Sequence, residues 1–220
     1  MTERVRIKIC CISSVDEALT AIRLGADALG FVSHMPSGPG VIGEDLIRDI
    51  VARVPPPVAT FLLTSHQDTD VIIDQQRRCG VNTLQLVDDL SPGSHERLRK
   101  ALPGVSIVQV VHVRDESAIA AAQAIQHTVD ALLLDSGNPG LAVKELGGTG
   151  RTHNWDISRR LIESVEVPVF LAGGLNQQNA ADAIAATRPF GLDLCSGVRT
   201  DDRLDTDKLA AFMEAARRAE

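Results

Sequence analysis

The chain has 220 residues, 44% of them hydrophobic, which is enough to bury one substantial core. Its formal net charge is −7 and no cluster of Lys or Arg stands out, which argues against nucleic acid or an anionic membrane as a partner. We therefore expect one domain over residues 1–220 that acts on a small molecule.

Apolar runs rich in Val, Ile and Leu alternate with helical patterns along the whole chain. Strands are predicted at residues 5–10, 28–33, 58–64, 83–87, 106–113, 131–135, 167–172 and 191–195. Helices are predicted at residues 15–24, 44–54, 70–79, 94–102, 116–125, 155–165, 179–187 and 206–218. Eight such units with no spare antiparallel pattern favour a closed (β/α)8 barrel over an open doubly wound sheet.

Helix ends carry recognisable signals. Ser13 or Ser14 is expected to cap the first helix. Gly25, Gly80 and Gly104 are expected to be turn residues with positive φ.

The last two units each end their strand in a turn of small residues, Gly173-Gly174 and Ser196-Gly197. Backbone N–H groups at such a turn are free to face an anion. In (β/α)8 barrels phosphate commonly binds after the seventh and eighth strands. We therefore predict a phosphate site at Gly173, Gly174, Ser196 and Gly197.

Cys10 ends the first predicted strand and Asp135 ends the sixth, so both are expected at the same face of the barrel. A thiolate and a carboxyl group flanking a bound sugar would serve as base and acid. Each residue alone also has a structural interpretation, Cys10 as a small buried apolar residue and Asp135 as a loop cap. Their joint placement beside the predicted phosphate site favours chemistry.

Further polar residues lie close to the predicted strand ends. Asp193 alternates with two leucines and is expected either to line the barrel mouth or to cap neighbouring backbone. Gln85 is expected to point inward as a hydrogen-bonding group. Lys8 would be either a Schiff-base amine or an ion-paired inward residue. Adjacent Asp88 and Asp89 follow the fourth predicted strand and could reach the barrel mouth, although adjacent acids after a strand are more typical of a solvated turn.

Two connections, residues 34–43 and 136–153, are longer than a barrel needs. Long loops at the catalytic face commonly cover a substrate. The glycine-rich run at 147–150 favours a mobile covering segment over a passive surface loop.

The cysteines at positions 10, 11, 79 and 195 show no CxxC spacing, and adjacent Cys10 and Cys11 are poor partners for a metal or a disulfide framework. The histidines also lack metal-ligand spacing. With no signal-peptide core and no apolar run of membrane-spanning length, a reducing cytoplasm fits best.

Several segments resemble, in order, the phosphoribosylanthranilate isomerase family of tryptophan biosynthesis. They are Lys8-Ile9-Cys10 and residues 25–32, 133–135, 147–155, 171–176, 188–189 and 193–198. The cysteine strand and the Gly-Gly-Thr-Gly segment with its following Trp are the most specific, whereas the phosphate turns are shared with many barrels.

The resemblance implies an Amadori rearrangement of an aminoaldose to an aminoketose without a metal or organic cofactor. Cys10 would match the general base and Asp135 the general acid. Gln85, Lys8, Asp193 and Arg151 are further candidates for substrate binding. We expect a phosphosugar substrate and a monomer or a homodimer.

Three positions depart from the family pattern. Where the family has Cys-Gly this chain has Cys10-Cys11, the arginine that grips the aromatic carboxylate is replaced by Gly40, and a histidine is replaced by Val87.

Arg151 or Lys144 would then have to supply the cation. Two alternative functions therefore stay open. One is an isomerase of the same family that acts on a phosphosugar with a less acidic aglycone, and the other is a phosphometabolite-binding barrel without catalysis.

Overall fold

The computed structural model describes residues 4–138, 140–141, 143–146 and 152–219. Within these residues, eight parallel strands close into a barrel in which each strand pairs with the next and β8 returns to β1. The strands are β1 (Arg6–Ile9), β2 (Ala28–Val32), β3 (Ala59–Thr64), β4 (Thr83–Leu86), β5 (Ser106–His112), β6 (Ala131–Asp135), β7 (Val169–Leu171) and β8 (Gly191–Leu194). The predicted (β/α)8 barrel is confirmed.

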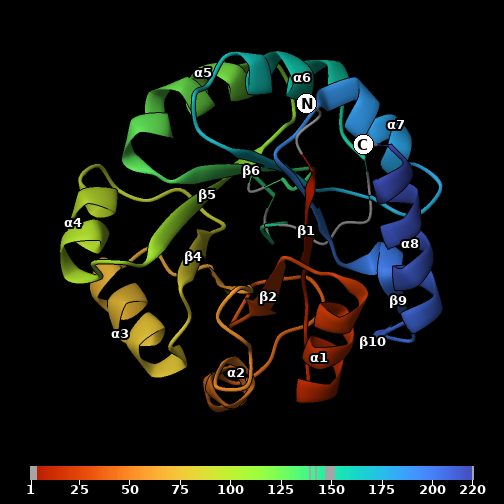
Figure 1. Cartoon of the computed structure of the whole chain (residues 1–220). Coiled ribbons are helices and arrows are strands. Elements are labelled where there is room, and N and C mark those ends of the chain that lie inside the picture. Colours follow the sequence, from red (N-terminus) through yellow and green to blue (C-terminus); the bar gives the residue numbers. More distant parts are fainter. Residues whose placement is uncertain (1–3, 139, 142, 147–151, 220) are drawn as a thin grey trace.

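The helices form a ring around the strands (Figure 1). They are α1 (Val15–Leu24), α2 (Glu44–Val51), α3 (Thr69–Cys79), α4 (Ser94–Ala101), α5 (Ser117–Ile125), α6 (Trp155–Glu163), α7 (Ala180–Thr187) and α8 (Thr206–Arg218), with short 3-10 turns η1 (Gln126–Thr128) and η2 (Ser196–Val198). Every predicted strand and helix is present, with ends that differ by at most three residues. In the described part of the chain, none of the helices has the length and apolar character needed to cross a bilayer.

One small element contradicts the prediction that no antiparallel pattern is present. After η2, β9 (Arg199–Thr200) and β10 (Arg203–Leu204) pair as an antiparallel hairpin. Its turn residues Asp201 and Asp202 have φ values of 48° and 58°. Strands of two residues are too short to produce an alternating pattern, so they leave no signal in the sequence.

The predicted helix signals are confirmed. The Ser14 side chain accepts a hydrogen bond from Glu17 N at 3.1 Å and caps α1. Gly25, Gly80 and Gly104 adopt φ values of 106°, 71° and 86°, a conformation that glycine enters without a Cβ clash.

The register at the barrel closure positions the ends of β1 and β8. Lys8 lies opposite Asp193, and Ile9 lies opposite Leu194. Because the strands are parallel, the residues that follow them, Cys10-Cys11 and Cys195-Ser196, emerge side by side at the C-terminal face of the barrel. Segments at opposite ends of the sequence therefore meet at the barrel closure.

Candidate active site

A cavity opens at the C-terminal ends of the strands, which is the face predicted to carry the chemistry. Cys10 and Asp135 both line it, although Cys10 follows β1 and Asp135 ends β6. Asp193 and Gln85 line the same cavity. The structure thus brings together four of the residues that sequence reasoning singled out.

A buried ion pair lies beneath this cavity. Lys8 Nζ is 2.8 Å from Asp193 Oδ1, and the lysine side chain is fully buried. The ammonium also lies 5.2 Å from the centroid of the Phe61 ring. Of the two interpretations of Lys8, the structure supports the ion-paired inward residue over the Schiff-base amine. Of the two alternatives for Asp193, the structure supports a residue that lines the barrel mouth over a cap for neighbouring backbone.

Lys8 also lies close to the Cys10 thiol, and Gly30 of β2 provides the space. A Cβ at Gly30 would lie 2.9 Å from Lys8 Nζ and 3.0 Å from Cys10 Sγ. Both Asp193 and Cys10 favour the charged ammonium, and together they raise the pKa of Lys8 although burial, the largest single effect, lowers it. Lys8 is therefore a cation within the barrel.

Burial raises the pKa of the Cys10 thiol to about 11, and the nearby Lys8 opposes this shift. Asp193 and Asp135 add to the upward shift because a thiolate would face two carboxylates. In these surroundings the neutral thiol dominates at neutral pH, and any additional positive charge beside the sulfur would favour the thiolate.

Burial also raises the pKa of Asp135, to about 6, while hydrogen bonds from Ser136 oppose the shift. The Ser136 backbone N–H donates to Asp135 Oδ1 at 2.7 Å, which fixes the carboxyl group at the end of β6. A carboxyl group with a pKa close to neutral can give up and take back a proton near neutral pH, which suits a general acid.

The two glycine turns after β7 and β8 pack against each other. A Cβ at Gly197 would overlap the carbonyl oxygen of Leu175. Gly173 and Gly174 have φ values of 88° and 63° and line the cavity together with Ser196. The Asn179 side chain donates to the Gly174 carbonyl at 3.0 Å and holds that turn at the start of α7. Gly197 supports the turns without lining the cavity itself.

Gln85 at the end of β4 is 3% exposed, and its Oε1 has no hydrogen-bond partner among the described residues. A buried amide oxygen without a partner is costly, so a ligand hydroxyl in the cavity would satisfy it. This position agrees with the prediction that Gln85 points inward.

The cavity has two chemically different sides. We call the side formed by Cys10, Asp135, Asp193 and the glycine turns the charged half. The other side, which we call the neutral half, comes from the ends of β2, β3 and β4 and consists of Val32, Met35, Leu63 and Val87. No Arg, Lys or His is found among the described residues that line the cavity.

Gly40, in the long loop after β2, has a conformation that excludes a side chain. Its φ is 79°, and a Cβ there would lie 2.5 Å from Cys11 Cβ and 3.1 Å from Cys11 Sγ. The side chain of Cys11 thus occupies the space that an arginine at position 40 would need. Cys11 and Gly40, which both depart from the family pattern, therefore pack against each other.

The prediction for Asp88 as a solvated turn residue is wrong, whereas Asp89 is exposed as predicted. Asp88 is buried and forms an ion pair with Lys144. The lysine reaches it from the long loop after β6, and such a contact between distant loops leaves no local pattern. Lys144, considered above as a substitute cation, is thus already paired with a carboxylate.

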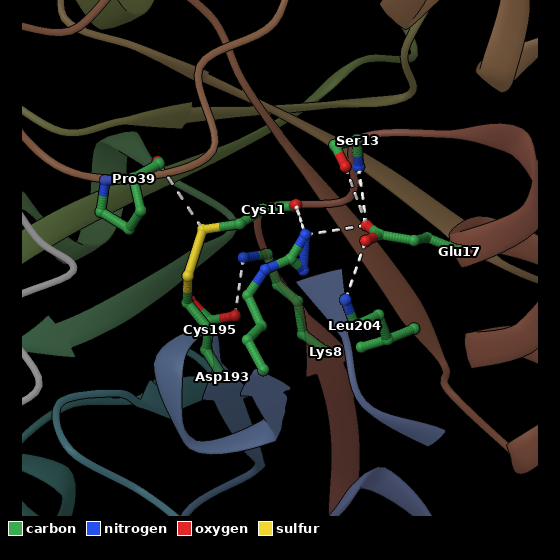
Figure 2. Close-up of a disulfide and its surroundings, with 9 residues drawn as sticks. Lys8, Cys11, Ser13, Glu17, Pro39, Asp193, Cys195 and Leu204 are labelled. Carbon is green, nitrogen blue, oxygen red and sulfur yellow. Dashed lines mark hydrogen bonds and ion pairs between the residues drawn. A yellow bond between two sulfur atoms is a disulfide. The ribbon is translucent and has the colours of Figure 1, made fainter. Parts of the chain in front are cut away.

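The prediction that adjacent Cys10 and Cys11 are poor partners for a disulfide framework is wrong for Cys11. Cys11 and Cys195 are bonded to each other, with their Cα atoms 5.8 Å apart (Figure 2). Local spacing concealed the pair because 184 residues separate the two cysteines. The signal that could have revealed it was topological, since each follows one of the two strands that meet at the barrel closure.

Arg151 and the glycine run at 147–150 lie outside the described residues. Arg151 as a contact for the substrate, and residues 147–150 as a covering segment, stay predictions.

Comparison with known proteins connects this cavity to a family. Residues 7–215 match the family model for N-(5'-phosphoribosyl)anthranilate isomerase. The enzyme of that name from Desulforudis audaxviator is 38% identical over 97% of this chain and 98% of its own length.

Solved structures agree. Phosphoribosyl anthranilate isomerase from Thermotoga maritima superposes with a TM-score of 0.83 at 28% identity, covering 97% of this chain and 98% of that one. Another isomerase structure, solved in complex with reduced 1-(o-carboxyphenylamino)-1-deoxyribulose 5-phosphate, gives a TM-score of 0.81 at 26% identity over 97% and 98% of the two chains. This chain, with its thiol and carboxyl group on one cavity beside paired glycine turns, belongs to the N-(5'-phosphoribosyl)anthranilate isomerase family.

Proposed function

We propose that this chain isomerises N-(5'-phosphoribosyl)anthranilate to 1-(o-carboxyphenylamino)-1-deoxyribulose 5-phosphate. The observation that carries the proposal is the presence of Cys10 and Asp135 on one buried cavity next to the glycine turns. The family membership and the relatives described above agree with this reaction.

In the first step, Asp135 acts as the general acid. It protonates the ring oxygen of the furanose while the nitrogen lone pair forms the C1–N double bond and the C1–O bond breaks. A carboxyl group with a pKa of about 6 is partly protonated near neutral pH, so its raised pKa serves this step.

In the second step, Cys10 acts as the general base on the ring-opened iminium ion. The cation acidifies the proton at C2. The minor thiolate form of Cys10, whose own proton has passed to solvent, removes the C2 proton and becomes a thiol, and the resulting enolamine tautomerises to the aminoketose as its hydroxyl loses a proton and C1 gains one. The iminium charge next to the sulfur adds to that of Lys8 and favours the thiolate, which burial alone disfavours. Lys8 thus acts as a positioning residue for the base.

The remaining candidates bind the substrate. Backbone N–H groups of the turn at Gly173–Gly174, which precedes α7, and of the turn at Ser196–Gly197, which begins η2, would bind the phosphate. Gln85 Oε1 would accept a hydrogen bond from a ribose hydroxyl, since it has no partner among the described residues.

A second candidate function differs only in the aglycone, and a specific observation favours it. The neutral half contains no cation among its described residues, and Cys11 blocks a side chain at Gly40. An isomerase of the same family that acts on a phosphoribosyl-amine without a carboxylate would suit this side of the cavity. Arg151 is the residue we predict to bind the carboxylate if anthranilate is the aglycone.

The test is turnover of freshly prepared phosphoribosylanthranilate, followed by the loss of its fluorescence. Cys10→Ser and Asp135→Asn should each lower kcat by a factor of about 10²–10⁴, the range for loss of a general acid or base. Both variants should still bind the reduced product analogue, which separates lost chemistry from lost folding. Binding of the analogue without turnover by the unaltered chain would favour the second candidate or a non-catalytic barrel.

Three further predictions accompany this proposal. We expect one domain over residues 1–220, a cytoplasmic location and a monomeric or homodimeric state. Cytoplasmic proteins rarely keep permanent disulfides, so in that compartment the Cys11–Cys195 bond would be reversible.

A further inference from the structure

The Cys11–Cys195 disulfide lies in the active-site cavity without taking part in the acid–base chemistry. Both cysteines line the cavity. Cys11 directly follows the proposed base Cys10, and Cys195 directly precedes Ser196 of the proposed phosphate site. The bond therefore joins the segment that carries the base to the turn that binds the phosphate.

Cys11 holds a backbone conformation that a residue with a side chain rarely adopts. Its φ is 62°, in the left-handed region, where a Cβ is disfavoured. Its carbonyl oxygen accepts a buried hydrogen bond from Arg199 at 2.7 Å, and Arg199 in turn pairs with Glu17 at 2.8 Å. This network and the disulfide hold the residue from two sides, so removal of the covalent link leaves an unfavourable conformation with less support.

The Cys11 sulfur has a second partner on the opposite side. It lies 3.9 Å from the carbonyl oxygen of Pro39, in the loop that borders the neutral half (Figure 2). A disulfide sulfur has no proton to donate, whereas a thiol at this position would donate one to Pro39. Oxidised Cys11 is thus linked to the phosphate turn, and reduced Cys11 would be linked to the loop at Pro39.

We propose that Cys11 and Cys195 are a reversible oxidation site through which thiol redox state controls phosphate binding. The oxidised form holds the turn at Ser196–Gly197 in its binding position, and the reduced form releases it. The inference rests on the phosphate site of the proposed function, because the turn that it controls is the one assigned there.

The chemistry balances with a dithiol as the reductant. Cys195 is the more accessible of the two cysteines, so a dithiol thiolate attacks its sulfur, the bond between the two cysteines breaks, and Cys11 leaves as a thiolate that takes a proton. The second thiol of the reductant then displaces Cys195 from the mixed disulfide, which gives two protein thiols and a cyclic disulfide. Two electrons pass from the dithiol to the protein.

The first measurement equilibrates the native chain with oxidised or reduced dithiothreitol, removes the reagent, and counts free thiols after denaturation in a thiol-blocking reagent. We expect two free thiols, Cys10 and Cys79, in the oxidised form and four in the reduced form. Peptide mapping should identify the bonded pair as Cys11 and Cys195. A chain that never forms this bond under oxidising conditions overturns the proposal.

The second measurement is the Kd for inorganic phosphate in each redox state. Reduction should weaken binding by about 10-fold, the scale expected when one left-handed residue is free to relax. Phosphate should also slow the reduction, because it occupies the turn beside Cys195. Equal Kd values in both states, or no phosphate binding in either, overturn the proposal.

Substitutions at the cysteines test whether the Cys11–Cys195 bond itself controls the Kd for phosphate. Cys195→Ser and Cys11→Ser each remove the bond and keep a Cβ at position 11, whose φ is 62°, so each should show the Kd of the reduced form under all conditions. Cys79→Ala, at a free buried cysteine away from the cavity, is the matched control and should keep the full redox response. None of these readouts needs turnover, so a redox-dependent Kd without isomerisation would contradict the proposed reaction and leave this inference intact.

Discussion

The charged half and the neutral half of the cavity differ in how their residues are held. In the charged half, Asp193 and Asp135 are fixed by hydrogen bonds from Lys8 and Ser136, and two glycine turns interlock. In the neutral half, apolar side chains pack without directional contacts. The proposed proton transfers and phosphate binding would therefore use groups in fixed positions, whereas selection of the aglycone in the neutral half would depend mainly on shape.

Removal of the buried Lys8 ammonium should have the largest effect on stability and turnover. Lys8→Met leaves Asp193 as an uncompensated buried charge, which should lower the free energy of unfolding by about 3–5 kcal/mol and abolish most turnover. Denaturant unfolding and kcat/KM measure the two effects.

The double variant Lys8→Met with Asp193→Leu is the control for this prediction. It removes both charges, so stability should recover while activity should not. Recovery of activity in the double variant would contradict a role for Lys8 in positioning Cys10.

The Asp135→Asn substitution should stabilise the protein while it inactivates the enzyme. The pKa of Asp135 is raised from 3.8 to about 6, so the folded state binds a proton more tightly than the unfolded state and loses stability as the pH rises through this window. The variant avoids that loss, and its gain should be about 2–3 kcal/mol at pH 7 and absent below pH 4.

Chemical denaturation of both proteins at pH 4 and pH 7 tests this result. Because the asparagine Oδ1 can still accept the hydrogen bond from Ser136, a loss of stability at pH 7 would argue that the carboxyl group is not desolvated as described.

A methyl group at Gly197 should disturb the charged half selectively. Its Cβ would overlap the Leu175 carbonyl and force the two turns apart, so the Kd for inorganic phosphate should rise by about 10- to 100-fold. Gly43→Ala is the matched control, because a Cβ added there would meet nothing within 4 Å and the φ of Gly43 is −71°. Unchanged phosphate affinity in Gly197→Ala would place the anion elsewhere.

Loss of the cation predicted to bind the aglycone carboxylate should give the smallest effect. If anthranilate is the aglycone, Arg151→Ala should raise KM for the carboxylated substrate by about 10-fold, the scale of one charge-assisted contact, and leave a substrate without the carboxylate unaffected. Steady-state kinetics with both substrates measure this ratio, and Lys144→Ala serves as the comparison because Lys144 is paired with Asp88. A preference for the substrate without the carboxylate in the unaltered chain would support the second candidate function.

Much of the charged half was accessible from the sequence because strand ends can be located by pattern. The alternation of strands and helices placed Cys10 and Asp135 at one face, and the small-residue turns marked the region of Gly173 and Ser196. These are local signals, since a strand end or a glycine turn depends on a few neighbouring residues.

The sequence by itself determined the barrel, the order of its elements and the strand ends where chemistry was to be sought. Only the tertiary structure decided that Lys8 pairs with Asp193, that Cys11 is bonded to Cys195 and that Lys144 reaches Asp88. The first two pairs span the barrel closure, which brings the two ends of the sequence together. The pKa values of Cys10 and Asp135 were decided in the same way, because burial is a property of the whole fold and leaves no trace in the neighbouring residues.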